Sequence, residues 1–199
     1  MPTWIAASTG STSPGDKLMQ HARGLYALSA TFMLALAANA AQEPFDWKSF
    51  SSPEMKFEAM LPGEAQPYAE RRRAKNGLTA ISRVYGAGNP QFFCTAGYTI
   101  YVGKLGDDKR SPLEAARDDF VSAFYATELE SREVSVPRSP DGSLKAIRFI
   151  AISDERRYTA IMAQDGDRVY EVVASSVRFG FSPDDVDRCL AGFKVMGAP

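Results

Sequence analysis

The sequence has almost no histidine and no excess of basic charge. Its single histidine, His21, lies in an N-terminal segment that we expect to be removed, so residues 41–199 contain none. This absence excludes Ser–His and Cys–His nucleophile pairs and the commonest transition-metal ligand, whereas carboxylate, lysine and tyrosine chemistry remains open. The chain carries 23 Lys+Arg against 24 Asp+Glu. A nearly neutral domain lacks the concentrated basic face that nucleic acid requires, so we predict no nucleic-acid partner.

The sequence also lacks an apolar run long enough to cross a membrane as a helix. The apolar stretch at residues 24–37 has about 14 residues, whereas a bilayer core requires about 20. Basic residues precede the stretch, and Ala38 and Ala40 follow it at the two positions that signal peptidase reads. This three-part pattern is typical of a secretory signal peptide, so we predict cleavage between Ala40 and Ala41. The alternative is a buried N-terminal helix.

The signal pattern divides the chain into two parts. Residues 1–40 are predicted to be an N-terminal extension and signal peptide, and residues 41–199 a single exported domain in the periplasm or secreted medium. The first part holds two basic residues and one acidic residue, which leaves 21 basic and 23 acidic residues in the second. No membrane span is expected after cleavage.

Cysteine is scarce, with only Cys94 and Cys189, and both fall in the predicted exported domain. Two thiols in an oxidising compartment often pair, so we predict a disulfide between them. The alternative is two separately buried thiols that act as small apolar residues. A redox-active pair is disfavoured because the Cys-x-x-Cys spacing is absent.

Local signals along residues 41–199 alternate between strands and helices. Residues 41–56 read as polar and turn-rich, residues 92–102 as a core strand rich in aromatic and β-branched side chains, and residues 133–136 as a short strand. Ser111 to Glu114 forms a capping box ahead of an apolar helical stripe, and Ser182 begins a second helix. The order is strands, helix, strands, helix. It predicts an α+β domain, with an antiparallel sheet of about 6–8 strands flanked by two helices.

Short motifs in the exported part resemble those of small exported bacterial domains of unknown function. The motifs are SFSSPEMKFEAMLPGEA at residues 49–65, RVYEV at 168–172 and FKV at 193–195, and the resemblance covers most of residues 45–196. Such domains look like relatives of the PsbP-like fold family, whose fold is an antiparallel sheet flanked by helices. The resemblance implies a protein that binds or helps assemble larger complexes and is not generally catalytic. It transfers no functional residue to this chain.

Arginine clusters are the strongest candidates for a binding surface in the sequence. Arg71, Arg72 and Arg73 fall on one predicted strand, and Arg156 and Arg157 on another. Together they could form a cationic patch for an anionic partner, and the favoured alternative is a set of solvated edge-strand arginines that discourage sheet-to-sheet pairing. The acidic clusters lack the ligand spacing of a calcium loop. We therefore predict no metal, no cofactor and no catalytic residue.

These observations favour a non-catalytic exported protein that binds or helps to assemble another envelope protein or complex. Two other functions stay open: a small carboxylate-dependent envelope hydrolase and a structural component of an envelope complex. A cleft holding two close carboxylates would favour the hydrolase. An exposed apolar patch of several hundred Å² would favour a partner-binding module.

Overall fold

The structure is a computed structural model that describes residues 44–74, 77–102, 110–140, 142–178 and 182–197. These residues all belong to one unit, Gln42–Pro199. The predicted signal peptide and its cleavage site at Ala38, Ala40 and Ala41 lie outside the described residues. None of the helices formed by the described residues is both long and apolar enough to span a membrane.

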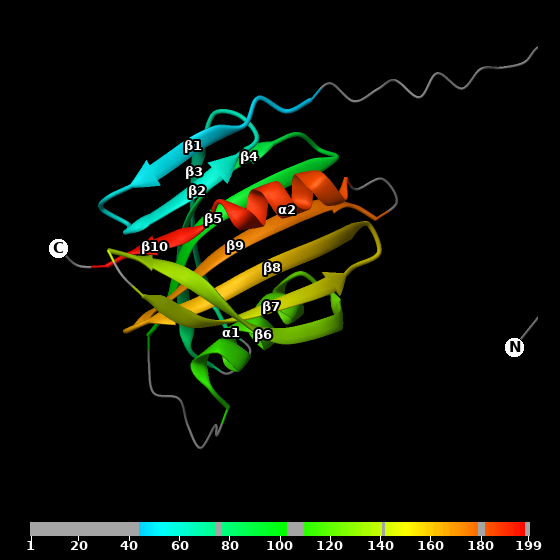
Figure 1. Cartoon of the computed structure of the whole chain (residues 1–199). Coiled ribbons are helices and arrows are strands. Elements are labelled where there is room, and N and C mark those ends of the chain that lie inside the picture. Colours follow the sequence, from blue (N-terminus) through cyan, green and yellow to red (C-terminus); the bar gives the residue numbers. More distant parts are fainter. Residues whose placement is uncertain (1–43, 75–76, 103–109, 141, 179–181, 198–199) are drawn as a thin grey trace, which may run out of the picture. The chain divides into compact units, whose positions relative to one another are not determined.

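Ten strands and two helices make up this unit within the described residues (Figure 1). The helices are α1 (Pro112–Ala123) and α2 (Pro183–Ala191). The strands are β1 (Lys48–Ser52), β2 (Phe57–Leu61), β3 (Gln66–Arg73), β4 (Thr79–Gly88), β5 (Phe92–Val102), β6 (Thr127–Ser139), β7 (Ser143–Ile152), β8 (Arg156–Asp165), β9 (Arg168–Val177) and β10 (Lys194–Met196).

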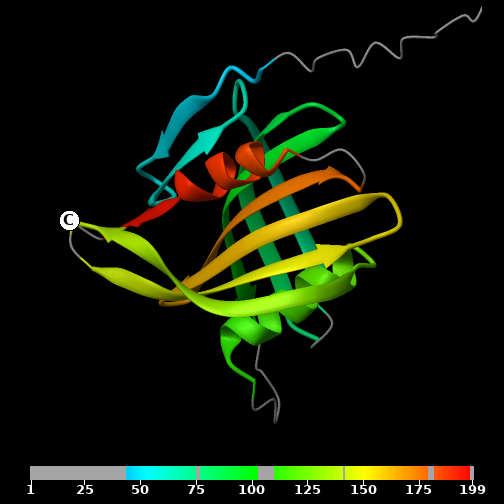
Figure 2. The same cartoon turned by 45° about the vertical axis from the view of Figure 1, so that its right-hand side comes forward.

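All ten strands join one sheet in the order β1-β2-β10-β6-β7-β8-β9-β5-β4-β3. Every pairing is antiparallel except that of β10 with β6, where Val195 lies opposite Arg138. Figures 1 and 2 show that the sheet of long central strands is strongly twisted. The order leaves β3 as one edge strand of the sheet and β1 as the other.

The α+β prediction was wrong: the domain is mostly β, with ten strands in a curled, mixed sheet rather than six to eight antiparallel strands. Two segments account for much of the difference. The stretch read as polar and turn-rich contains β1, and the short strand expected at residues 133–136 is the middle of the 13-residue β6. Both segments are rich in polar residues, so their sequences carry little of the apolar alternation that marks a strand.

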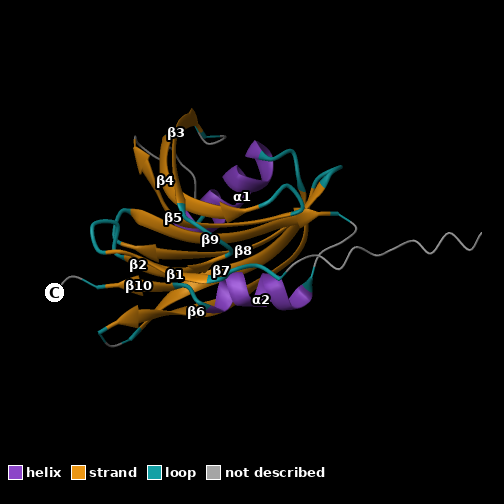
Figure 3. Ribbon diagram, turned by 90° about the horizontal axis from the view of Figure 1, so that it is seen from above, coloured by secondary structure: helices purple, strands orange, loops and turns teal. Residues whose placement is uncertain are grey.

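The two helices lie on opposite sides of the central strands, as the view from above shows (Figure 3). Side chains alternate between the two faces of a strand, so each long strand supplies both sides. On the α2 side, Tyr170 and Val172 of β9 pack into a core that contains Cys189 and Leu190. On the α1 side, the next residue of β9, Val173, joins Phe120 in a second core. The sheet thus lies between two apolar layers, one on each of its faces.

Candidate functional site

Helix α1 begins at a capping box that the sequence predicts correctly. The Ser111 hydroxyl oxygen accepts a hydrogen bond from the backbone N–H of Glu114 at 3.2 Å. In return, the Glu114 carboxylate accepts the Ser111 backbone N–H at 2.8 Å. Hydrogen bonds from Ser111 hold the pKa of Glu114 below its usual 4.5. The helix start is therefore fixed by its own sequence, independently of what the helix covers.

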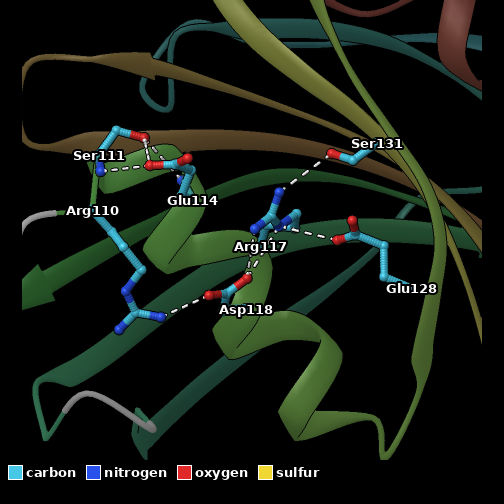
Figure 4. A network of polar contacts seen from close by, with 7 residues as sticks. All are labelled: Arg110, Ser111, Glu114, Arg117, Asp118, Glu128 and Ser131. Atoms are coloured by element: carbon cyan, nitrogen blue, oxygen red, sulfur yellow. Dashed lines mark hydrogen bonds and ion pairs between the residues drawn. The ribbon is translucent and has the colours of Figure 1, made fainter.

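One side of α1 is fastened to β6 by Arg117 (Figure 4). Its guanidinium contacts the Glu128 carboxylate at 3.1 Å and donates a hydrogen bond to the Ser131 hydroxyl at 3.4 Å. The same guanidinium meets Asp118 at 2.9 Å, and Arg110 meets this carboxylate from the other side at 2.6 Å. Partial burial alone would raise the pKa of Asp118, but hydrogen bonds from the two arginines outweigh it and lower that pKa. The contacts of Arg117 with Glu128 and Ser131 therefore hold α1 close to β6.

The other side of α1 faces β3, β4 and β5 across an open cleft of about 500 Å³. In Figure 3 these three strands rise beside α1 at one end of the sheet. Most of the lining is apolar or aromatic: it comprises Tyr68, Ala69, Glu70, Ser82, Val84, Phe93, Thr95, Phe120, Ala123, Phe124, Tyr158, Glu171, Val173 and Ser175. Its volume falls in the range of small-molecule sites, about 300–1,000 Å³.

The walls of the cleft are aromatic. Phe120 and Phe124 of α1 stack at a centroid distance of 4.6 Å, and Phe124 lies 5.1 Å from the ring of Tyr158. On the opposite wall, Tyr68 makes an edge contact with Phe93 at 6.0 Å. Tyr68 and Phe124 are 48% and 45% exposed, so both present large apolar surface to the outside. Exposed rings facing each other across a cleft are typical of a binding surface.

A row of polar side chains crosses four adjacent strands beside this apolar surface. The Ser82 and Thr99 hydroxyl oxygens lie 2.7 Å apart, and Thr99 donates to the Glu171 carboxylate at 3.1 Å. Since the Thr99 proton goes to Glu171, the proton between the two hydroxyls must come from Ser82. Glu70 of β3 lies opposite Ser82 in the strand register and lines the same cleft.

Two glycines allow very close contacts between β4 and β5 beside the cleft. A Cβ atom added at Gly97 of β5 would lie 2.2 Å from the Arg83 carbonyl oxygen of β4. One added at Gly86 of β4 would lie 2.6 Å from the ring of Phe93. Only glycine permits backbone and ring to approach this closely at these two positions.

The cleft continues toward the β4–β5 turn, where a second hollow of about 440 Å³ shares Phe93, Phe124 and Tyr158 with it. Arg156 lies in this hollow and is held in place by three hydrogen bonds. It donates to the Ser175 hydroxyl at 2.6 Å, to the Ser175 carbonyl at 3.1 Å and to the Pro90 carbonyl at 3.0 Å. Arg156 therefore ties the β4–β5 turn to β9.

The structure contains the predicted disulfide between Cys94 and Cys189, with their Cα atoms 6.0 Å apart. Both residues are fully buried on the α2 side of the sheet, away from the cleft. The bond joins β5 to the last helix across 95 positions of sequence.

The five arginines predicted as a patch do not meet. Arg71, Arg72 and Arg73 lie on edge strand β3 near the end of β5 that holds Val102, because Arg73 pairs with Thr79 and Thr79 with Val102. Arg156 and Arg157 lie near the opposite end of β5, since Arg157 pairs with Ser176 and Ser176 with Phe92. The two groups are therefore separate surfaces, one on an open strand edge and one beside the β4–β5 turn.

Sequence reasoning did not single out Glu70, Ser82, Thr99, Glu171 or Phe124. A signal exists for two of them, because Thr99 and Glu171 are polar residues in strands that are otherwise largely apolar on both faces. Buried polar side chains in such strands are expected to have hydrogen-bond partners, and Thr99 is only 3% exposed. The identity of those partners depends on strand order, which local sequence does not give.

Comparisons with known proteins give one solved structure to report. No protein-family model matches this sequence, and no curated protein matches it. The chain is similar to the solution structure of cyanobacterial PsbP (CyanoP) from Synechocystis sp. PCC 6803, with 10% identity and a TM-score of 0.47. The match covers 80% of this chain and 97% of that one. No functional residue is transferred from it to this chain.

Proposed function

We propose that this protein is an exported, non-catalytic accessory protein that acts by binding, and that the cleft between α1 and strands β3–β5 is its binding surface. The observation that carries this proposal is the open apolar cleft beside α1. Arg117 fastens the helix to β6, whereas its Phe120 and Phe124 edge faces β3 across an open apolar space of about 500 Å³.

Export is supported by the signal pattern at residues 1–40 and by the disulfide. Disulfides persist in oxidising compartments, and the Cys94–Cys189 bond joins two otherwise distant parts of the domain. A periplasmic or secreted location would place the cleft among envelope proteins and their ligands.

The test fills the cleft and measures binding of an apolar probe, the dye 1-anilinonaphthalene-8-sulfonate. Ala123 lines the cleft from α1, so Ala123→Trp places an indole in the apolar space. Its neighbour Ser122 is exposed and is not part of the cleft lining, so Ser122→Trp is a matched control. We expect Ala123→Trp to weaken dye binding by about tenfold, the effect of about 1.4 kcal/mol, and Ser122→Trp to leave it unchanged.

Methyl NMR locates the bound dye. Val84 and Val173 lie on the cleft walls, so their signals should shift on titration, whereas Val195 in the α2-side core should not. Dye binding that is unaffected by Ala123→Trp, or that shifts Val195 alone, would contradict the proposal.

The second candidate function is a small carboxylate-dependent hydrolase, and one observation favours it: Glu70 and Glu171 line the same cleft. Such chemistry needs one carboxyl kept protonated as the acid. In the structure, a carboxylate oxygen of Glu171 accepts a hydrogen bond from the Thr99 hydroxyl at 3.1 Å, so this oxygen is already engaged within the domain. Hydrolysis of 4-nitrophenyl esters or glycosides by the wild type, lost in Glu171→Gln, would replace the binding proposal with the enzymatic one.

A further inference from the structure

The cleft opens directly onto a strand edge that carries no partner. β3 ends the sheet, and among the described residues no strand pairs with its outer side. Its described side chains, from Gln66 to Arg73, are exposed. The cleft lining includes Ala69 as well as Tyr68 and Glu70, so the apolar space reaches the backbone of the edge.

The strand register shows which backbone groups face outward. Ala74 donates its N–H to the Leu78 carbonyl, and every β3–β4 pair continues the same register. Because hydrogen-bonded and outward-facing residues alternate along an antiparallel strand, Gln66, Tyr68 and Glu70 bond to β4. Ala69 and Arg71 therefore direct their N–H and C=O groups to the open edge, and Arg73 does so at the end of the strand.

Pro67 fits this alternation. It falls on the outward-facing set, where a missing N–H removes nothing from the β3–β4 ladder. The outer edge of β3 thus presents the backbone N–H groups of Ala69 and Arg71. These groups lie beside the apolar cleft, and α1 forms the opposite wall of that cleft. A strand edge facing a helix across an apolar groove is the geometry in which extended peptides bind by adding a strand.

We infer that the cleft binds an extended segment of a partner protein, which pairs antiparallel with the outer edge of β3 and inserts alternate apolar side chains between β3 and α1. This inference rests on the proposed function, because it names the occupant of the same cleft. Side chains directly opposite each other in such a pair share a face. One set of partner side chains meets the cleft beside Tyr68 and Glu70, and the other set lies beside Arg71 and Arg73.

The charge of β3 determines which partner side chains are favoured opposite Arg71 and Arg73. Arg71 and Arg73 are exposed on β3, so acidic side chains opposite them give favourable cross-strand pairs and basic ones give repulsion. The partner segment therefore alternates apolar and acidic residues. The same arginines discourage pairing with a second basic edge, which leaves the site open for an acidic strand.

A second copy of this chain fits the cleft poorly. The outer side of β6 between Thr127 and Pro137 carries Glu128, Glu130 and Glu133, so its charge would suit β3. However, Val134 and Val136 of this stretch pack against the chain's own α2-side core. Leu129 alone among its aliphatic side chains is left for the apolar cleft, so this strand would leave the cleft largely unfilled. A separate partner is the better match to both charge and apolar surface.

The experiment uses a capped octapeptide of alternating leucine and glutamate, with an alternating leucine–lysine octapeptide as its control. Binding of the acidic peptide should slow hydrogen exchange at the Ala69 and Arg71 amides at least tenfold and shift the methyl signals of Val84 and Val173. The leucine–lysine peptide should do neither. The double variant Arg71→Glu with Arg73→Glu should reverse the preference. Arg132→Glu with Lys145→Glu, two exposed changes on β6 and β7, should leave it unchanged.

Methylated peptides test backbone pairing without altering the protein. Glutamates opposite Arg71 direct their N–H groups toward β3, whereas the leucine N–H groups point away. N-methylation at the glutamates should abolish binding, and N-methylation at the leucines should preserve it. Equal effects of the two methylations, or a peptide-free dimer with protected β3 amides, would overturn the inference.

The dye measurement separates this inference from the proposed function. If the dye still shifts Val84 and Val173 but the peptide leaves Ala69 and Arg71 unprotected, the peptide proposal fails and the binding cleft stands. If neither probe reaches the cleft, both fail.

Discussion

Breaking the Cys94–Cys189 disulfide is the perturbation whose effect on stability is best defined. The bond closes a loop of 95 positions, which is most of the described unit. The loop-entropy model assigns about 4.7 kcal/mol to a loop of this length, as an upper value. Domains of this size have total stabilities of about 5–15 kcal/mol, so the loss is a large fraction of the whole.

Urea unfolding of three forms measures this contribution: the oxidised protein, the reduced protein and the double variant Cys94→Ala with Cys189→Ala. With a denaturant slope of about 2 kcal/mol/M, the midpoint should fall by about 2 M on reduction. The double variant should fall further, because it also removes two fully buried sulfur atoms from the α2-side core.

In the folded protein, the local loosening after reduction should be confined to the α2 face of the sheet. α2 has nine residues, too few for a stable helix alone, so its amides should exchange faster after reduction. The cleft lies on the α1 face, so dye binding at Val84 and Val173 should persist. A midpoint that moves by less than about 0.5 M on reduction would refute the stability argument. Loss of dye binding in the still-folded reduced protein would show that the two faces are coupled.

Two further predictions concern the elements that frame the cleft. Gly97→Ala should lower the free energy of unfolding by about 1–3 kcal/mol, because the new Cβ would lie 2.2 Å from the Arg83 carbonyl oxygen. An unchanged urea midpoint would mean that β4 moves aside without cost. The stability that Glu114 contributes should be fully present above pH 4.5 and be lost as the pH falls below it, because the folded-state pKa is lowered. The melting temperatures of the wild type and of Glu114→Gln should therefore converge in acid. A difference between the two melting temperatures that stays constant down to about pH 3 would contradict capping by an ionised Glu114 carboxylate.

Local chemistry was read correctly wherever a few neighbouring residues decide the structure. The capping box at Ser111, the second cap at Ser182 and the core strand at residues 92–102 all lie where the sequence predicted them. Each depends on hydrogen bonds or side-chain preferences within one turn or one strand. The sheet class was wrong because strand number and direction depend on β1, on the full length of β6 and on the parallel arrival of β10.

The sequence by itself determined both helix caps, the core strand at residues 92–102, the pair of cysteines and the near-neutral charge. Tertiary structure alone decided which side chains come together at the cleft. Glu70, Ser82, Thr99 and Glu171 line up only because β3, β4, β5 and β9 are neighbours, although β9 follows β5 by more than sixty positions. Residues of β3, β4 and β5 meet α1 around one cleft, while Arg117 holds the helix toward β6. Strand order and curvature are set by the packing of the whole sheet, and no local stretch of sequence encodes them.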